Sequence, residues 1–429
     1  MTKPFPPLIP NPSPQGEGIK NQQRVVITGI GIASPLGNTA EEFCQRLFNG
    51  EMGIRPIQDN VDLSQVKATF AAQLWPLPEP TWKNRIDQKN SSLLSAVTLF
   101  TAQQAVAQSG LIPAELDVAQ CGVIVGSGFH NLYDLEKTYQ DFYRHDIKMA
   151  TLTIPKNMSS APATRIAINY GFQGIVSSVS SACSSGFTAI RDSVRLIQSG
   201  AQDVMITGGS DLVVCETLLM AWERMRVTSQ GKTPELGCRP FDKSRSGIVL
   251  GDGVVSLVLE SLGSAQARGA TILAEIKSVF QNSDSLDLVK PNSAGEVTCM
   301  QTALDLAGLR PDDIDLIFPH ATGTRANDTI EYEAMAEVFG PDLADTPVCA
   351  LKSMLGHTMG ASGPMSVAAA LGSLSDGYIY PVPNLEELED GIDLNIGTVG
   401  EKRPSIKNIL INTFAFGGIN VSLVLSKAE

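Results

Sequence analysis

The segment CGVIVGSG at residues 121–128 reads as a buried β-strand that ends in glycines. A similar apolar run leading into small residues occurs at 25–31 and again at 203–209, and a further apolar run covers 254–260. A long segment of helical character, residues 91–109, precedes the quoted stretch. Strands that are apolar throughout and alternate with helices are typical of parallel-rich sheets covered by helices on both faces. The sequence therefore predicts an α/β fold.

The second half of the chain repeats this order of elements. The repeated elements are expected strands at 271–279, 314–318 and 348–351 and helices at 297–307 and 364–374. The two halves share the order of their elements but almost no residues, so the inference of an internal duplication rests on that order alone. We expect a flexible proline-rich tail at 1–22, an N-terminal half at 23–267 and a C-terminal half at 268–429.

The composition limits the possible functions. Hydrophobic residues make up 43% of the 429 residues and charged residues 18%, as in a compact soluble enzyme. The formal net charge of −13 argues against a general nucleic-acid binder, because phosphate groups require a basic face. We expect no membrane span, no secretory signal and a cytoplasmic location, and the 7 scattered cysteines show no metal-ligand spacing.

Cys183 lies among small residues, in the stretch SSACSSG at 180–186. Apolar spacing from Phe187 to Ile197 predicts a helix directly after it, which places the cysteine at a helix N-terminus. At that position the macrodipole favours a thiolate, and unpaired backbone N–H groups could hold an oxyanion. A small buried residue that only packs the turn fits the local sequence equally well.

Two of the 4 histidines, His320 and His357, lie where expected strands give way to glycine-rich turns. Strand ends are where a rigid sheet presents side chains to a ligand. Lys352 precedes His357 by five residues, and if it is drawn inward it needs a carboxylate partner. Asp328 and Glu331 share one helix face and are the candidates, although a solvated acidic helix start would have the same spacing.

Five motifs follow one another along the chain. They are SACSSG at 181–186, RPFDK at 239–243 with GDG at 251–253, HATGT at 320–324, KSMLGH at 352–357 and NTFAFGGIN at 412–420. With these motifs the chain from Arg24 onward resembles the elongating β-ketoacyl-acyl-carrier-protein synthases, the condensing enzymes of fatty-acid and type II polyketide synthesis. The resemblance implies the thiolase fold, in which two duplicated halves form a five-layered α/β/α/β/α core, and usually a homodimer.

The resemblance also implies a two-stage reaction. Cys183 would take an acyl chain from the phosphopantetheine arm of an acyl-carrier protein. Malonyl-carrier protein would then lose carbon dioxide, and its enolate would attack the thioester to give a β-ketoacyl chain two carbons longer. A thiolate suits this role because it is a good nucleophile and its thioester stays reactive. No metal or redox cofactor is implied.

The same resemblance assigns helpers to the cysteine. Imidazole N–H groups of His320 and His357 would stabilise the enolate, because decarboxylation places negative charge on a thioester oxygen. Backbone N–H groups of Cys183 and Phe416 would hold the oxyanion during acyl transfer and condensation. Lys352 would order the segment around His320 through one of the two acidic candidates named above.

Other positions match substrate-binding residues of the family. Thr322 and Thr324 match positions that hydrogen-bond the pantetheine arm. Phe129 matches a position at the base of the acyl pocket, where its ring would shorten the pocket and favour small or flat acyl groups.

The sequence departs from the family pattern at several positions. Ala321 and Gly323 stand where Gly and Ser are usual, Arg325 where Pro is usual, Ser366 in place of a carboxylate, and Ala415 in place of a glycine of the gating loop. Ser366 puts in doubt a charge network between its helix and Lys352, and Ala415 would restrict the swing of Phe416.

Three other functions were weighed against the condensing enzyme. A degradative thiolase would carry a second cysteine in the C-terminal loop 414–420, which has none. A chain-length-factor partner, an inactive subunit of a heterodimeric synthase, would typically lack Cys183. A heterodimer with a second ketosynthase-like subunit and a decarboxylase that never condenses both stay open.

Overall fold

The computed structural model describes residues 23–58 and 61–428, and the expected tail at 1–22 lies outside the described residues. Its centre is a nine-stranded mixed sheet in the order β5-β4-β6-β7-β1-β8-β13-β12-β9. The strands are β1 Val25–Ala33, β4 Cys121–Gly126, β5 Val176–Val179, β6 Val204–Asp211, β7 Gly253–Ser261, β8 Ala274–Ser283, β9 Leu316–Phe318, β12 Asn408–Ala415 and β13 Ile419–Ser426. β1, β4, β6 and β7 are buried along their whole length, which explains why their sequences are mostly apolar.

The order of strands in the sheet is nearly symmetric about its middle. From the outer edge to the middle of the sheet, the N-terminal strands are the third (β5), second (β4), fourth (β6), fifth (β7) and first (β1) strands of their half. From the middle to the other edge, the C-terminal strands are the first (β8), last (β13), next to last (β12) and second (β9) strands of theirs. β1 and β8, the first strands of the two halves, pair antiparallel and join them. The duplication was inferred from the order of the elements alone, and this symmetry in the order of the strands supports it. We propose the boundary between the halves at residues 267 and 268, where helix α9 (Leu262–Ala267) ends.

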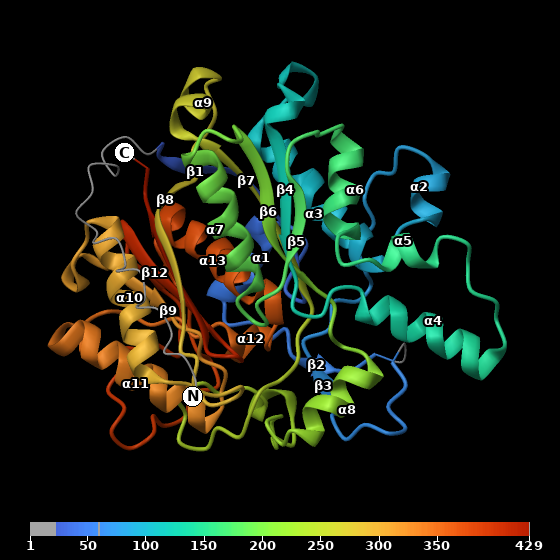
Figure 1. The fold of residues 1–429 in the computed structure, drawn as a ribbon. Helices are drawn as coiled ribbons and strands as arrows, with labels where there is room; N and C mark the ends of the chain where they lie inside the picture. The colour runs from blue at the N-terminus through green and yellow to red at the C-terminus, as the bar shows by residue number, and fades with distance from the viewer. Residues whose placement is uncertain (1–22, 59–60, 429) are drawn as a thin grey trace, which may run out of the picture.

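The N-terminal strands and the C-terminal strands form two layers, and helices form three more, so that the molecule has five layers (Figure 1). The middle layer holds α7 (Ser185–Gln198) and α13 (Ser362–Asp376), which pack against strands of both halves. α3 (Leu93–Ser109) and α6 (Ala161–Tyr170) cover the outer face of the N-terminal strands. On the opposite outer face, α10 (Ser293–Ala307) packs on β8 and β13, and α11 (Arg325–Phe339) packs on α10. Residues Ser362–Leu374 of α13 are all buried, as a middle layer requires.

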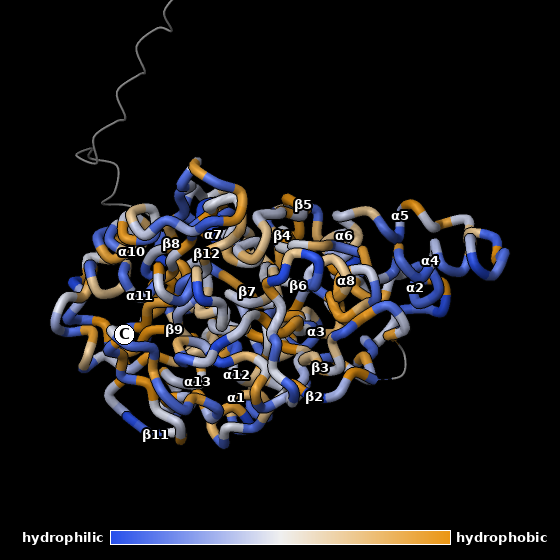
Figure 2. The backbone as a smooth tube through the Cα atoms, turned by 90° about the horizontal axis from the view of Figure 1, so that it is seen from below, coloured by the Kyte–Doolittle hydropathy of each residue, from blue (hydrophilic) through white to orange (hydrophobic). Residues whose placement is uncertain are grey.

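The remaining elements surround this core. They are α1 Ala40–Phe48, α2 Arg85–Lys89, α4 Leu132–His145, α5 Thr153–Asn157, α8 Glu216–Arg224, α12 Lys352–Leu355, and the short strands β2 Arg55–Pro56, β3 Phe70–Ala71, β10 Tyr378–Ile379 and β11 Glu401–Lys402. Figure 2 shows hydrophobic segments concentrated inside the molecule, and α4 extending away from it. In the part of the chain that the structure describes, no helix combines the length and apolarity needed to cross a bilayer.

The expected elements are confirmed with one exception. The expected strand at 348–351 does not form, because the chain turns into α12 immediately after Leu351. Only an isolated parallel bridge between Val348 and Ile317 remains of it. That bridge continues the C-terminal part of the sheet beyond β9, at the place that β5 occupies in the N-terminal part.

Candidate active site

Cys183 lies in a tight turn between β5 and α7, directly before Ser184, the cap residue of the helix. Ala182 adopts a left-handed conformation with φ of 50°, which is uncommon for a residue with a side chain. The Ser185 hydroxyl donates to the Ala182 carbonyl at 2.6 Å and so secures the turn. A Cβ on Gly186 would stand 2.5 Å from the carbonyl oxygen of Gly360, so this position requires glycine. The small residues around the cysteine are therefore needed for close backbone packing.

The turn brings Cys183 together with both expected histidines. Its Sγ lies 3.1 Å from Nε2 of His357, and the rings of His320 and His357 stand edge to face with centroids 5.3 Å apart. Sγ and one nitrogen of each ring lie within 4.8 Å of one another. A thiophilic ion such as zinc would accept these three donors, but it would have to displace the thiol proton first.

The backbone around His357 determines which ring nitrogen carries the proton. The N–H of Met359 points at Nδ1 of His357 over 3.3 Å, and the hydroxyl of Ser362 lies 3.0 Å from the same nitrogen. Because a backbone N–H can only donate, Nδ1 must be an acceptor. A neutral ring therefore carries its proton on Nε2, which faces the sulfur of Cys183.

A buried charge pair holds the backbone at His320. The carboxylate of Glu331 accepts hydrogen bonds from the N–H groups of His320 and Ala321 at 2.5 and 2.7 Å. On the other side, the ammonium group of Lys352 donates to the carbonyl oxygen of His320. Both charged side chains are buried. Each compensates the other electrostatically, and together they hold one short piece of chain.

Lys352 and its expected carboxylate partners, Asp328 and Glu331, act on the same segment without a direct contact. The direct partner of Lys352 is a carbonyl, because Asp328 and Glu331 use their oxygens on backbone N–H groups instead. Asp328 accepts from Gly323 and Phe241 and lies 3.6 Å from a buried arginine, Arg245. Lys352 and Glu331 still order the segment around His320, and Glu331 does so through its own hydrogen bonds to the backbone of that segment.

Burial controls the protonation states at this site. It raises the pKa of the Cys183 thiol to about 12, although the positive charge of Lys352 acts in the opposite direction. The expected preference for a thiolate is therefore wrong for this buried state, because removal of water outweighs the helix N-terminus. Burial, with repulsion from Lys352, also lowers the pKa of His320 and His357 well below the usual histidine value. All three groups are neutral near pH 7.

A narrow cavity of about 120 Å³ joins the catalytic groups to the surface. It is lined by Cys183, His320, His357, Thr322, Thr324, Trp222, Ile248, Glu296, Asn327, Phe414, Phe416 and Asn420, among others. The ring of Phe416 stacks on Trp222 with centroids 5.7 Å apart. Phe129 does not line this cavity. Its ring packs against the ring of Trp222, with the two centroids 6.4 Å apart. All the expected site residues thus converge, with Phe129 one aromatic ring further away.

Comparison with known proteins identifies the family. Residues 22–265 match the family described as "Beta-ketoacyl synthase, N-terminal domain", and residues 273–386 match "Beta-ketoacyl synthase, C-terminal domain". The chain belongs to the β-ketoacyl synthase family. It is 35% identical over 405 residues to nodulation protein E of Rhizobium sp. (strain N33), covering 94% of this chain and 98% of that one. It is 32% identical over 410 residues to 3-oxoacyl-[acyl-carrier-protein] synthase 2 of Coxiella burnetii, covering 95% and 99%.

Solved structures of β-ketoacyl synthases share the fold. The structure titled "The ishigamide ketosynthase/chain length factor" superimposes with a TM-score of 0.86 at 29% identity, covering 95% of this chain and 100% of that chain. A beta-ketoacyl synthase from Burkholderia phymatum STM815 gives the same TM-score, identity and coverage. A type II polyketide ketosynthase in complex with its acyl-carrier protein gives 0.84 at 25% identity, covering 95% and 100%. The thiolase fold is thereby established for this chain.

Three departures from the pattern of other β-ketoacyl synthases have local explanations. Ala321, where glycine is usual, has a positive φ of 44°, and this strained conformation is maintained by the carboxylate of Glu331 on its N–H. Gly323 has φ of 77°, which glycine adopts without strain. Ser366 donates to the carbonyl of Ser362 on its own helix, so its hydroxyl is used within α13.

Two residues at this β-ketoacyl synthase site were not found from the sequence. Asp211, at the end of β6, accepts from the Ser127 hydroxyl and from backbone N–H groups of Gly128, Phe129 and Gly360, and so fixes the segment that carries Phe129. An acidic residue ending a buried strand is a signal that could have identified it. Glu296, in α10, has no comparable signal in the sequence, because its burial depends on segments far away in the chain.

Proposed function

We propose that this β-ketoacyl synthase condenses an acyl group carried on Cys183 with a malonyl group presented by acyl-carrier protein, with loss of carbon dioxide. The observation that carries the proposal is the contact of the Cys183 sulfur with Nε2 of His357, with His320 beside it in one narrow cavity. One nucleophile and two neutral imidazoles are the groups that a decarboxylative condensation requires. The proposal makes the chain an acyltransferase.

In the first half-reaction the sulfur of Cys183 attacks the acyl thioester of the carrier. A new carbon–sulfur bond forms, the bond to the pantetheine sulfur breaks, and the proton of the thiol leaves with the pantetheine as its thiol. The Nε2–H of His357 points at the sulfur and stabilises negative charge on it during the attack. The backbone N–H groups of Cys183 and Phe416 are the proposed donors to the oxyanion.

In the second half-reaction the malonyl carboxylate leaves as carbon dioxide. The electron pair of the broken carbon–carbon bond becomes an enolate, which attacks the carbonyl carbon of the Cys183 thioester. A new carbon–carbon bond forms, the carbon–sulfur bond to Cys183 breaks, and the sulfur leaves as a thiolate that takes up a proton from water. The Nε2–H of His357 and the ring of His320 stabilise the enolate oxygen. Neutral imidazoles suit this step because they donate hydrogen bonds while the low pKa keeps them from protonating the enolate carbon first. Lys352 and Glu331 position His320.

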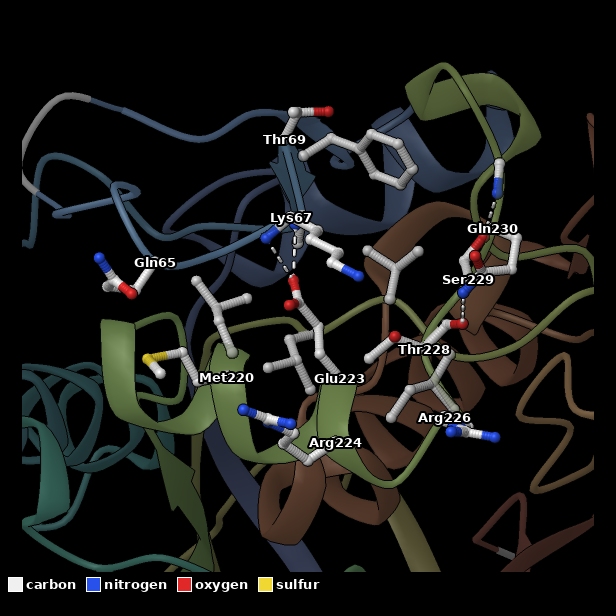
Figure 3. Close-up of a pocket in the computed structure, with 17 residues that line it drawn as sticks. Gln65, Lys67, Thr69, Met220, Glu223, Arg224, Arg226, Thr228, Ser229 and Gln230 are labelled. Atoms are coloured by element: carbon white, nitrogen blue, oxygen red, sulfur yellow. Dashed lines mark hydrogen bonds between the residues drawn. The ribbon is translucent and has the colours of Figure 1, made fainter.

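An open groove next to the catalytic cavity is the proposed docking place of the carrier. The groove has a volume of about 890 Å³ and shares the side chain of Ile248 with the catalytic cavity. Figure 3 shows Lys67, Arg224 and Arg226 around it, and all three are exposed. Cationic side chains bind phosphate groups, so the phosphate of phosphopantetheine is their proposed partner. The pantetheine arm would then pass Ile248 toward Thr322 and Thr324.

Three further inferences concern the location, the oligomeric state and the pathway of the protein. We infer a cytoplasmic enzyme from its 7 free cysteines, all of which are buried. We also infer a dimer, either of two identical chains or with a second ketosynthase-like subunit. The pathway is proposed as fatty-acid or specialised polyketide synthesis, in line with the relatives.

The test follows the two half-reactions separately. The protein is incubated with acyl-carrier proteins of several chain lengths, and intact mass is measured to detect an acyl adduct. Malonyl-carrier protein is then added, and the β-ketoacyl product is measured. We expect an adduct that Cys183→Ala abolishes and Cys44→Ala, a change at a distant buried cysteine, leaves intact. An adduct that survives in Cys183→Ala would end the proposal. Release of carbon dioxide without any product would instead favour a decarboxylase.

A further inference from the structure

One buried acid in the catalytic cavity has no role in the reaction described above. Glu296 lies in the first turn of α10 and is fully buried. It lines the same cavity as Cys183, His320 and His357. Neither of its carboxyl oxygens has a hydrogen-bond partner. A buried polar group without a partner is costly, so its presence requires an explanation.

The fold itself does not use this side chain. Other buried acids near the site, Asp211 and Glu331, each accept two or more hydrogen bonds from the backbone. Glu296 accepts none, and it forms no ion pair among the described residues. Burial raises its pKa well above the usual value, and the nearby carboxyl groups of Glu331 and Asp284 act in the same direction. Burial and the neighbouring carboxyl groups therefore favour the neutral acid, which can donate one hydrogen bond.

Two loops that line the cavity together with Glu296 are hydrogen-bonded to each other. The N–H of Gly417 donates to the carbonyl of Leu288 at 2.8 Å, and the N–H of Asp284 donates to the carbonyl of Gly418 at 2.8 Å. The cavity has a volume of about 120 Å³. Gly417 and Gly418 both have positive φ, and a Cβ on Gly417 would make only ordinary contacts with Ile419, at 3.8 and 3.9 Å. Because Glu296 lines the cavity that also holds Cys183, a substrate bound in the cavity reaches the acid.

The two sides of the cavity differ in chemistry. The side nearest Cys183 belongs to an apolar cluster that includes Trp222 and Phe416, which suits an acyl chain. The lining outside this cluster includes the polar side chains of Thr322, Asn327 and Glu296. Of the groups that enter the cavity during the proposed reaction, the malonyl carboxylate is the strongest hydrogen-bond acceptor.

We propose that Glu296 binds the carboxylate of the malonyl extender as a neutral hydrogen-bond donor, and thereby selects a carboxylated extender. The proposal rests on the proposed function. A neutral acid gives a strong O–H···O⁻ bond without a cation that would hold the carboxylate back. When the carbon–carbon bond breaks, its electron pair passes to the enolate and carbon dioxide leaves. Glu296 keeps its proton throughout, so the residue determines specificity and takes no part in the chemistry.

The test separates the two half-reactions in Glu296→Ala, Glu296→Gln and the matched control Asp305→Ala, which removes an exposed carboxyl from the same helix. Glu296→Ala is expected to raise KM for malonyl-carrier protein at least tenfold, to change kcat little, and to leave acylation of Cys183 within twofold of wild type. Glu296→Gln keeps one donor and is expected to recover part of the lost affinity. Asp305→Ala should match wild type.

A binding measurement keeps the test independent of turnover. Malonyl- and acetyl-pantetheine amides, which do not undergo the reaction, are titrated into the full-length protein and Glu296→Ala, with thermal unfolding as the check of folding. Wild type is expected to prefer the malonyl amide, and Glu296→Ala to lose that preference. An unchanged preference in a folded variant would overturn the proposal, and so would an equal loss in the acylation step, which would place Glu296 on the acyl side. Failure of wild type to acylate Cys183 would instead overturn the proposed function.

Discussion

Lys352 offers the sharpest test of how this site is held together. The change Lys352→Met removes a buried ammonium group but keeps an unbranched side chain of similar length. The carbonyl oxygen of His320 then loses its hydrogen bond, and the buried carboxylate of Glu331 loses its compensating charge. Burial raises the pKa of Glu331 to about 7, and the positive charge of Lys352 opposes that rise, so removal of Lys352 favours the neutral acid further. A neutral Glu331 holds the N–H groups of His320 and Ala321 less tightly.

The magnitude follows from these bonds. A hydrogen bond to a charged group contributes ~1.5–3 kcal/mol, and weakening of the bonds to Glu331 adds about 1 kcal/mol. The total of about 2.5–4 kcal/mol overlaps the cost of breaking a buried charge pair, roughly 3–5 kcal/mol. If this energy appears as misplacement of the His320 ring in the transition state, decarboxylation slows by about 10²–10³-fold, since ~1.4 kcal/mol corresponds to tenfold.

The assay is release of carbon dioxide from malonyl-carrier protein, measured apart from acylation of Cys183. Thermal unfolding of the same samples shows whether the variant is folded, and Lys407→Met, a change at an exposed lysine, is the control. We expect Lys407→Met to retain wild-type decarboxylation. A folded Lys352→Met that decarboxylates within threefold of wild type would refute the reasoning that the charge pair positions His320.

Two further predictions concern the pocket and the pH dependence. Phe129→Ala removes one ring from the group that contacts Trp222, so the variant should accept longer acyl chains than wild type in the acylation assay; an unchanged chain-length profile would contradict this. Because the folded-state pKa of His320 and His357 is depressed below the unfolded value of about 6.5, both rings stay neutral as pH falls through 6.5. The decarboxylation rate should therefore show no acidic limb near 6.5. The unfolded chain binds these protons first, so the free energy of unfolding should decrease as pH falls below 6.5. A limb near 6.5 that disappears in His357→Gln would be inconsistent with neutral buried rings.

The sequence predicted the elements of the core well, because each one carries its own pattern. β4 and the first half of β6 are continuous apolar runs because both faces of the strands are covered, and such runs can be recognised in the sequence. The helix after Cys183 was predicted from its apolar spacing for the same reason. The prediction of a strand at 348–351 was wrong. These apolar residues lead directly into α12, and the hydrophobic pattern does not indicate that turn.

The sequence by itself determined which residues take part: Cys183, His320, His357 and Lys352 are identified by motifs that lie within a few residues of each of them. Only the tertiary structure decided their states. The pKa of a thiol or an imidazole depends on how much water the whole fold removes, and that is why the expected thiolate gave way to a buried thiol. The partner of Lys352 and the buried position of Glu296 likewise depend on segments brought together from distant parts of the chain. The local sequence identifies the residues of the site, whereas burial and long-range contacts determine their protonation states.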